Sequence, residues 1–182
     1  DRDNGWDKQP KVLLQVRHPG EKFVERAENE WPLARTRWTN YYLDPDGMRL
    51  SHVPVTRASS LTYDAMGDGL TFSTPPLTHA TEITGPAALK LFISSSTTDA
   101  DFFIVLRVFD PSGKELVFQG ALDPHTPIAQ GWLRASHRKL DPQLSLPYRP
   151  YHTHDEKQPL TPDEIVELDI EIWPTSIVVP AG

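Results

Sequence analysis

The segment 133–142, LRASHRKLDP, contains the three residue types of the commonest hydrolytic triad. A serine hydroxyl becomes a nucleophile when a histidine takes its proton and an aspartate orients that histidine. A strand is expected over Gly131–Ser136, and adjacent side chains of a strand point to opposite faces, so His137 would not reach Ser136. We therefore predict no catalytic residue here: Ser136 and His137 form a polar edge, and Asp141 caps the turn that follows.

A second group of chemically capable residues is His152-Thr-His154-Asp155. In an extended segment the two histidines share a face, an arrangement that suits a transition metal. A third ligand could come from Asp155, His125 or His79. A pair of solvated loop histidines is the commoner arrangement, and no set of orienting partners is evident. The prediction is therefore no metal ligand and no bound cofactor.

Two acidic residues, Asp99 and Asp101, precede an apolar run and could bind a hard cation such as calcium through their oxygens. The calcium-loop pattern, with glycine at its sixth position, is missing. We therefore expect these carboxylates to accept hydrogen bonds from backbone amides where a loop enters a strand.

Aromatic residues that could bind a ligand form a fourth group: Trp31, Trp38, Tyr41, Tyr42 and Trp132. On a β-sandwich such rings can stack on sugars or on another domain, because a ring face is apolar. They can equally be core residues, and both readings stay open.

Composition limits what the chain can be. The 182 residues carry a formal net charge of −7 and a pI of about 5.4, which argues against a nucleic-acid-binding surface. There is no cysteine, so disulfides and cysteine-ligated metal sites are excluded, and a reducing, cytoplasmic location is expected. No apolar run approaches the roughly 20 residues that span a bilayer, and the polar amino end predicts no signal peptide.

The elements that must position these residues are predominantly strands. Residues 166–173 alternate apolar and acidic side chains without error, and 89–93 alternates with one exception. Residues 102–109 are apolar on both faces, which predicts a central strand. The turns Asp44–Gly47 and Asp110–Gly113 predict two hairpins, the second leading into a strand over 115–122. Further strands are expected at 12–17, 70–73, 131–136 and 177–179.

Helical periodicity is almost absent, and only residues 21–30 suggest a turn or two of helix. Residues 141–162 form a long loop with five prolines, which we expect to pack through Leu144, Leu146, Tyr148 and Tyr151. Many short strands joined by turns predict an all-β, two-sheet jelly-roll sandwich of the galactose-binding-like type.

Several motifs in this order resemble one known domain: residues 70–115 (LTFSTPPLTHATEITGP…DPSGKE), GWLRASHRKLDP, YRPYHTH and VELDIEIWPTS. The chain is similar to the C-terminal, non-catalytic jelly roll of the X-Pro dipeptidyl peptidase and cocaine-esterase-like acyl hydrolases. The resemblance covers about residue 12 to the end. It implies that a complete enzyme adds an α/β-hydrolase domain carrying the catalytic triad and a helical cap.

On this resemblance, residues 1–11 are the tail of a preceding hydrolase domain, 12–60 a linking arm with the first strands, and 61–182 the jelly roll. Relatives continue beyond Pro180-Ala-Gly182 with one or two further strands, so we expect a sandwich cut before its last strand. An open sheet edge would favour homo-oligomers.

The expected function is an accessory domain of a serine hydrolase that packs on the hydrolase and cap domains and helps shape the substrate pocket. The parent protein, and not this chain, would then be the enzyme. The alternatives are a free-standing carbohydrate-binding module and a self-contained hydrolase that uses Ser136 and His137. Nucleic acid and membrane are not expected as partners.

Overall fold

The structure is a computed structural model that describes residues 3–182, and its regular elements are strands apart from two short 3₁₀ turns. The expected all-β class is therefore confirmed. The elements are η1 (Trp6–Lys8), β1 (Val12–His18), β2 (Lys22–Glu28), β3 (Tyr42–Asp44), β4 (Arg49–Ser51), β5 (Thr81–Ile93), β6 (Asp101–Leu106), β7 (Val108–Phe109), β8 (Glu115–Leu116), β9 (Ala129–Arg134), η2 (Ala135–His137) and β10 (Val166–Val179).

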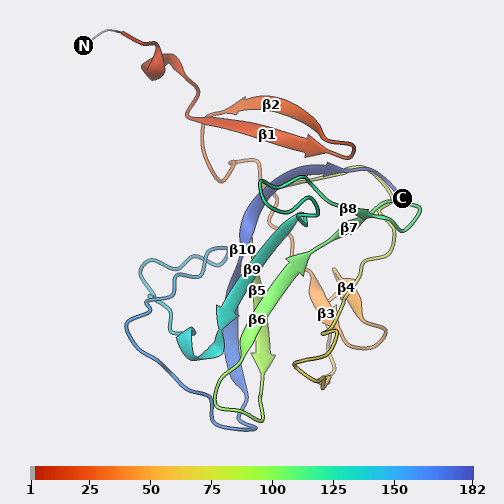
Figure 1. Cartoon of the computed structure of the whole chain (residues 1–182), viewed down its shortest axis with the longest axis vertical. Helices are drawn as coiled ribbons and strands as arrows, with labels where there is room; N and C mark the ends of the chain where they lie inside the picture. The colour runs from red at the N-terminus through yellow and green to blue at the C-terminus, as the bar shows by residue number, and fades with distance from the viewer. Residues whose placement is uncertain (1–2) are drawn as a thin grey trace.

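The long strand β10 organises the larger sheet, whose order is β2-β1-β10-β5 (Figure 1). Its antiparallel pairing with β5 runs from Val166↔Ile93 to Val179↔Thr81, with an irregularity between Ile172 and Thr175. Pro174 falls inside that irregularity, as expected for a residue that cannot donate to a sheet ladder. The two strands expected at 166–173 and 177–179 are thus one bulged strand.

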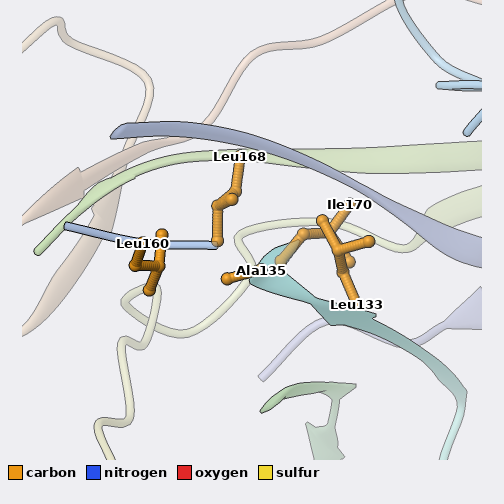
Figure 2. Close-up of a cluster of buried hydrophobic side chains, with 5 residues drawn as sticks. All are labelled: Leu133, Ala135, Leu160, Leu168 and Ile170. Carbon is orange, nitrogen blue, oxygen red and sulfur yellow. The ribbon is translucent and has the colours of Figure 1, made fainter. Parts of the chain in front are cut away.

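A second layer is formed by β6 paired with β9 and by the β7–β8 hairpin, and it faces β5 and β10 (Figure 1). The main core lies between the layers, where Leu168 and Ile170 of β10 are fully buried with Leu133, Ala135 and Leu160 (Figure 2). A second cluster contains Phe118, Ile128, Ile177 and Val179. Two sheets facing across apolar side chains make a sandwich, and jelly-roll connectivity stays a prediction.

The two layers come into backbone contact at Gly131 of β9. A Cβ atom at this glycine would overlap the carbonyl oxygen of Glu171 and press on the Cα of Ile172. Only a residue without a side chain lets β9 lie this close to the bulged part of β10. This close approach places β9 beside β10, and the turn η2 follows directly after β9.

The prediction of a helical turn within 21–30 is wrong, because Lys22–Glu28 is strand β2. All seven of its residues pair with β1, from Val12↔Glu28 to His18↔Lys22. The helical preference of residues 21–30 is weak, and backbone hydrogen bonding of this segment to β1 outweighs it. The β1–β2 hairpin then joins the sheet through β1 and β10, which run parallel at Arg17↔Ile177.

The prediction that 102–109 is a central strand is also wrong. Within the described residues, β6 pairs only with β9, and the segment breaks at Arg107 before β7 begins. Its inward residues Phe102 and Ile104 join the core, but Phe103 is 75% exposed and Val105 is 49% exposed. Strand β6 therefore has the sequence of a central strand and the position of an edge strand.

Both hairpins predicted from turn residues are confirmed: β3–β4 encloses Asp44–Gly47, and β7–β8 encloses Asp110–Gly113. Other strand predictions are too long or wrong. Residues 70–73 contribute only an isolated bridge at Ser73, and 115–122 contains the two-residue β8 followed by a bridge at Phe118.

The proline-rich loop 141–162 does pack on the sandwich, but largely through residues other than those predicted. Leu144, Leu146 and Tyr151 are exposed, whereas Leu160 is 4% exposed. The backbone amide of Leu160 donates to Thr98 O at 2.8 Å. Of the predicted anchors, Tyr148 stacks on Trp38. The remaining proposed anchors lie on the solvent side of the loop.

Candidate functional site

Ser136 lies in the 3₁₀ turn η2 directly after β9, and not in the strand that the sequence predicted. Its side chain is 3% exposed. The hydroxyl donates to Asp99 Oδ2 at 2.6 Å, and its backbone amide donates to Asp99 Oδ1 at 2.9 Å. The serine is therefore a buried partner of a carboxylate, and no imidazole faces its hydroxyl.

Asp99 also accepts a hydrogen bond from the amide of Ala100 at 3.0 Å. Burial acts to raise the pKa of Asp99, but the hydrogen bonds from Ser136 and Ala100 outweigh it and hold the pKa below the ordinary value. The predicted role, in which an aspartate binds backbone amides at the entry to a strand, is confirmed for Asp99. Its bond to Ser136, 37 positions away, could not be read from the local pattern.

Asp101 pairs with a side chain rather than with backbone amides. Its two oxygens accept from Arg134 Nε at 2.7 Å and Nη2 at 2.8 Å, an ion pair across the β6–β9 ladder. The hydrogen bond from Arg134 lowers the pKa of Asp101. Both aspartates are thus occupied by partners that tie β6 to β9 and η2.

Asp141 is the turn cap that the sequence predicted. Its Oδ1 accepts from the amides of Gln143 at 2.8 Å and Leu144 at 3.0 Å. The three residues of the opening motif therefore have three separate partners: Asp99 for Ser136, His154 for His137, and local amides for Asp141.

The two loop histidines line the same pocket, with ring centroids 6.2 Å apart, but they have different hydrogen-bond partners. His154 has a left-handed backbone with φ 54°, which breaks the extended alternation. Its Nδ1 lies 3.1 Å from Nδ1 of His137. His152 instead places Nε2 3.0 Å from Asp169 O, and burial lowers its pKa. Its Nδ1 is buried without a hydrogen-bond partner among the described residues.

In residues 3–182 there is no group of three or more histidine, cysteine or acidic side chains that could hold a metal ion. Of the third ligands considered from the sequence, Asp155 is bound by Lys139 Nζ at 3.1 Å and by the Thr153 hydroxyl. His79 contacts Thr78, and the amide of His125 donates to Asp123 Oδ1 in a separate loop.

A cavity of about 470 Å³, which we call the Trp–His pocket, opens where β9, β10 and the proline-rich loop meet. Trp132 and Trp173 form one corner of it, with ring centroids 4.7 Å apart and planes inclined by 59°. Both rings are about half exposed. The pocket is lined in particular by Trp132, Trp173, Arg134, His137, His154 and Glu171.

Of the five aromatic residues singled out from the sequence, only Trp132 lies in this pocket. Trp38 stacks on Tyr148 with centroids 4.4 Å apart, and Tyr41 packs on His52. Trp31 lines a separate, smaller cavity together with Pro32, Tyr148 and Pro174. Trp173 was missed because it ends an alternating segment whose other outward side chains are acidic, and its partner Trp132 lies on a distant strand.

Across residues 4–182 the chain matches the X-Pro dipeptidyl-peptidase C-terminal non-catalytic domain, and it belongs to that family. The predicted resemblance is therefore confirmed. Two proteins named "Putative serine esterase", from Mycobacterium bovis and Mycobacterium tuberculosis, are each 35% identical over 106 residues. The match covers 56% of this chain and 15% of theirs.

Two crystal structures of a CocE/NonD family hydrolase from Staphylococcus aureus superimpose on the chain with a TM-score of 0.89. They are 29% and 30% identical, and the match covers 98% of this chain and 33% of theirs. An aminopeptidase from a Thaumarchaeota archaeon shares the fold, with a TM-score of 0.61 at 18% identity. The chain thus spans a small part of the relatives that it matches.

One further finding concerns membranes. Among the helical segments of residues 3–182, none has the length and apolar character needed to span a bilayer.

Proposed function

We propose that this chain is the non-catalytic accessory domain of a serine hydrolase of acyl-esterase or X-Pro dipeptidyl-peptidase type. The match to the non-catalytic domain over residues 4–182 is the observation that carries the proposal. The geometry agrees with it, because Ser136 is buried against Asp99 and its hydroxyl bonds to that carboxylate, with no histidine partner in residues 3–182. Residues 1–11 are the tail of the preceding domain, 12–60 the linking arm, and 61–182 the jelly roll.

The proposed role is to pack on the α/β-hydrolase and cap domains and help wall the substrate pocket. Support comes from the outer face of β6 and β9, where Phe103 and Trp132 are cross-strand partners. Phe103 is 75% exposed and Trp132 is 51% exposed, with Trp173 and Val105 also exposed. Large apolar surfaces of this kind mark interaction sites.

The test uses the parent protein and the isolated chain in parallel. Phe103→Asp should lower the melting temperature and the kcat/KM of the parent while leaving the melting temperature of the isolated chain nearly unchanged. Leu122→Asp is the matched control, because Leu122 is fully exposed in the loop between β8 and β9, away from this face. Equal effects of the two substitutions in the parent would argue against domain packing on this face.

A free-standing carbohydrate-binding module is the second candidate, and the Trp132–Trp173 corner beside polar groups favours it. Half-exposed indole rings can stack on the apolar faces of sugars. Calorimetric titration with a panel of oligosaccharides, using wild type and Trp173→Ala, separates the two candidates. Saturable binding that the substitution removes would support the module.

A third part of the proposal is that the chain forms homo-oligomers through an open sheet edge. The edge of β6 that faces away from β9 has no strand partner in the described chain. An unpaired edge beside an apolar face is a template for another strand. Light scattering across a concentration series should show a mass that rises with concentration, and a strictly monomeric mass at high concentration would count against it.

The cytoplasmic location is retained as a proposal, supported by the absence of cysteine. Cell fractionation with an antibody against the chain tests it directly.

A further inference from the structure

We propose that His137 and His154 together chelate one divalent transition-metal ion, such as Zn²⁺ or Ni²⁺, at the rim of the Trp–His pocket. The proposal starts from the two Nδ1 atoms, which lie 3.1 Å apart. With metal–nitrogen bonds of about 2.0–2.1 Å and a near-tetrahedral angle, two ligating nitrogens lie about 3.3 Å apart. The observed separation of the two Nδ1 atoms therefore differs by only about 0.2 Å from the separation that one shared metal ion requires.

The two rings come from segments that the fold holds in place independently. His137 is in η2, where the neighbouring Ser136 is bonded to Asp99 through both hydroxyl and amide. His154 is in the proline-rich loop, where the amide of Thr153 donates to Lys139 O at 3.1 Å. A pair held by tertiary contacts loses little freedom on binding a metal.

The backbone at His154 also points to this pairing. Its φ of 54° is uncommon for a residue with a side chain, although histidine adopts it more readily than most. Such conformations often occur at functional sites. His154 adopts this conformation where its Nδ1 meets Nδ1 of His137.

The surroundings leave room for a metal with further ligands. Both imidazoles line the pocket of about 470 Å³, so water or a substrate group could complete the coordination sphere. His152 is the third ring nearby, with its centroid 6.2 Å from that of His154.

A neutral hydrogen bond between the two rings would show the same separation, so metal titration is the deciding experiment. The chain should carry no polyhistidine tag, be stripped with a chelator, and be titrated calorimetrically with ZnCl₂, NiCl₂ and, as a hard-cation control, MgCl₂. We expect saturable binding of one Zn²⁺ or Ni²⁺ per chain, a melting temperature that rises with Zn²⁺, and no binding of Mg²⁺.

Substitutions then assign the site. His154→Gln, in an exposed part of the loop, and His137→Gln should each weaken Zn²⁺ binding at least tenfold, while His125→Gln, exposed elsewhere, should not. The melting temperature of each variant without metal checks that it is folded, and His154→Gln carries the test if His137→Gln is not. Absence of saturable binding to wild type, or equal Zn²⁺ affinity in wild type and His154→Gln, would overturn the proposal.

Discussion

At the residue scale, the feature that most shapes the interpretation is the pair formed by Ser136 and Asp99. Both oxygens of the carboxylate are occupied by groups of Ser136 and Ala100. The pair joins the loop before β6 to the turn after β9, beside Ala135, which is fully buried. A serine that looks catalytic in the sequence is thus a structural cross-link.

The hydroxyl of Ser136 should therefore contribute to stability. We expect Ser136→Ala to lower the free energy of unfolding by about 2 kcal/mol, because it removes a hydrogen bond to a charged group. Ser112→Ala is the matched control, since Ser112 donates to Asp110 at the same 2.6 Å but in an exposed turn. Urea unfolding of both variants measures the difference, and equal losses would contradict a special role for the buried pair.

Asp99 should make stability depend on pH. Its pKa is lowered in the folded chain, so its contribution is fully present above the unfolded pKa of about 3.9 and is lost as pH falls through the lower folded pKa. The difference in melting temperature between wild type and Asp99→Asn should therefore be largest near pH 6 and shrink below pH 4. A difference that does not change with pH would contradict this.

At the scale of elements, the two layers depend on one close backbone approach, between Gly131 of β9 and Glu171 of β10. The same region holds the bulge of β10 and the turn of Trp173 toward Trp132. The Trp–His pocket lies beside this approach, and Trp132, Glu171 and Trp173 from the two strands line it.

Gly131→Ala should separate β9 from β10. A methyl group would meet backbone atoms of Glu171 and Ile172, which cannot move aside as a flexible side chain can. We expect a loss of about 3 kcal/mol in the free energy of unfolding, together with a change in near-ultraviolet circular dichroism from the tryptophan pair. In the control Gly67→Ala, a Cβ lies 3.2 Å from Asp64 O in an exposed loop, and a loss there as large as at Gly131 would refute this explanation.

At the scale of the whole molecule, Phe103, Val105 and Trp132 expose apolar side chains on the outer face of β6 and β9, which supports the proposed packing on other domains. The chain covers 33% of the length of the Staphylococcus aureus hydrolase structures that it resembles. Both facts support a domain that contributes stability and shape rather than chemistry.

The isolated chain should not hydrolyse p-nitrophenyl acetate above the rate of buffer. Ser136 is 3% exposed, and its hydroxyl proton is directed to a carboxylate instead of a histidine. The measurement is absorbance of p-nitrophenolate with wild type and Ser136→Ala. Turnover that the substitution abolishes would restore the self-contained hydrolase as the correct reading.

Local patterns were sufficient for much of the fold. The alternation of 166–173 predicted which residues of β10 face the core, and the turn residues predicted both hairpins. The ordered motifs also predicted the family that the match over 4–182 confirms. Strand alternation, turn chemistry and ordered motifs depend on residues that are close in the sequence, so they can be predicted from the sequence alone.

Only the tertiary structure decided the partners of the chemically capable side chains. Ser136 meets Asp99, His137 meets His154, and Trp132 meets Trp173, each across loops or layers that no local pattern specifies. The edge position of β6 is likewise invisible in its apolar sequence, because strand pairing depends on which distant segments are available. The sequence by itself determined the all-β class, two hairpins, strand β10 and the family, whereas long-range packing determined what each reactive residue touches.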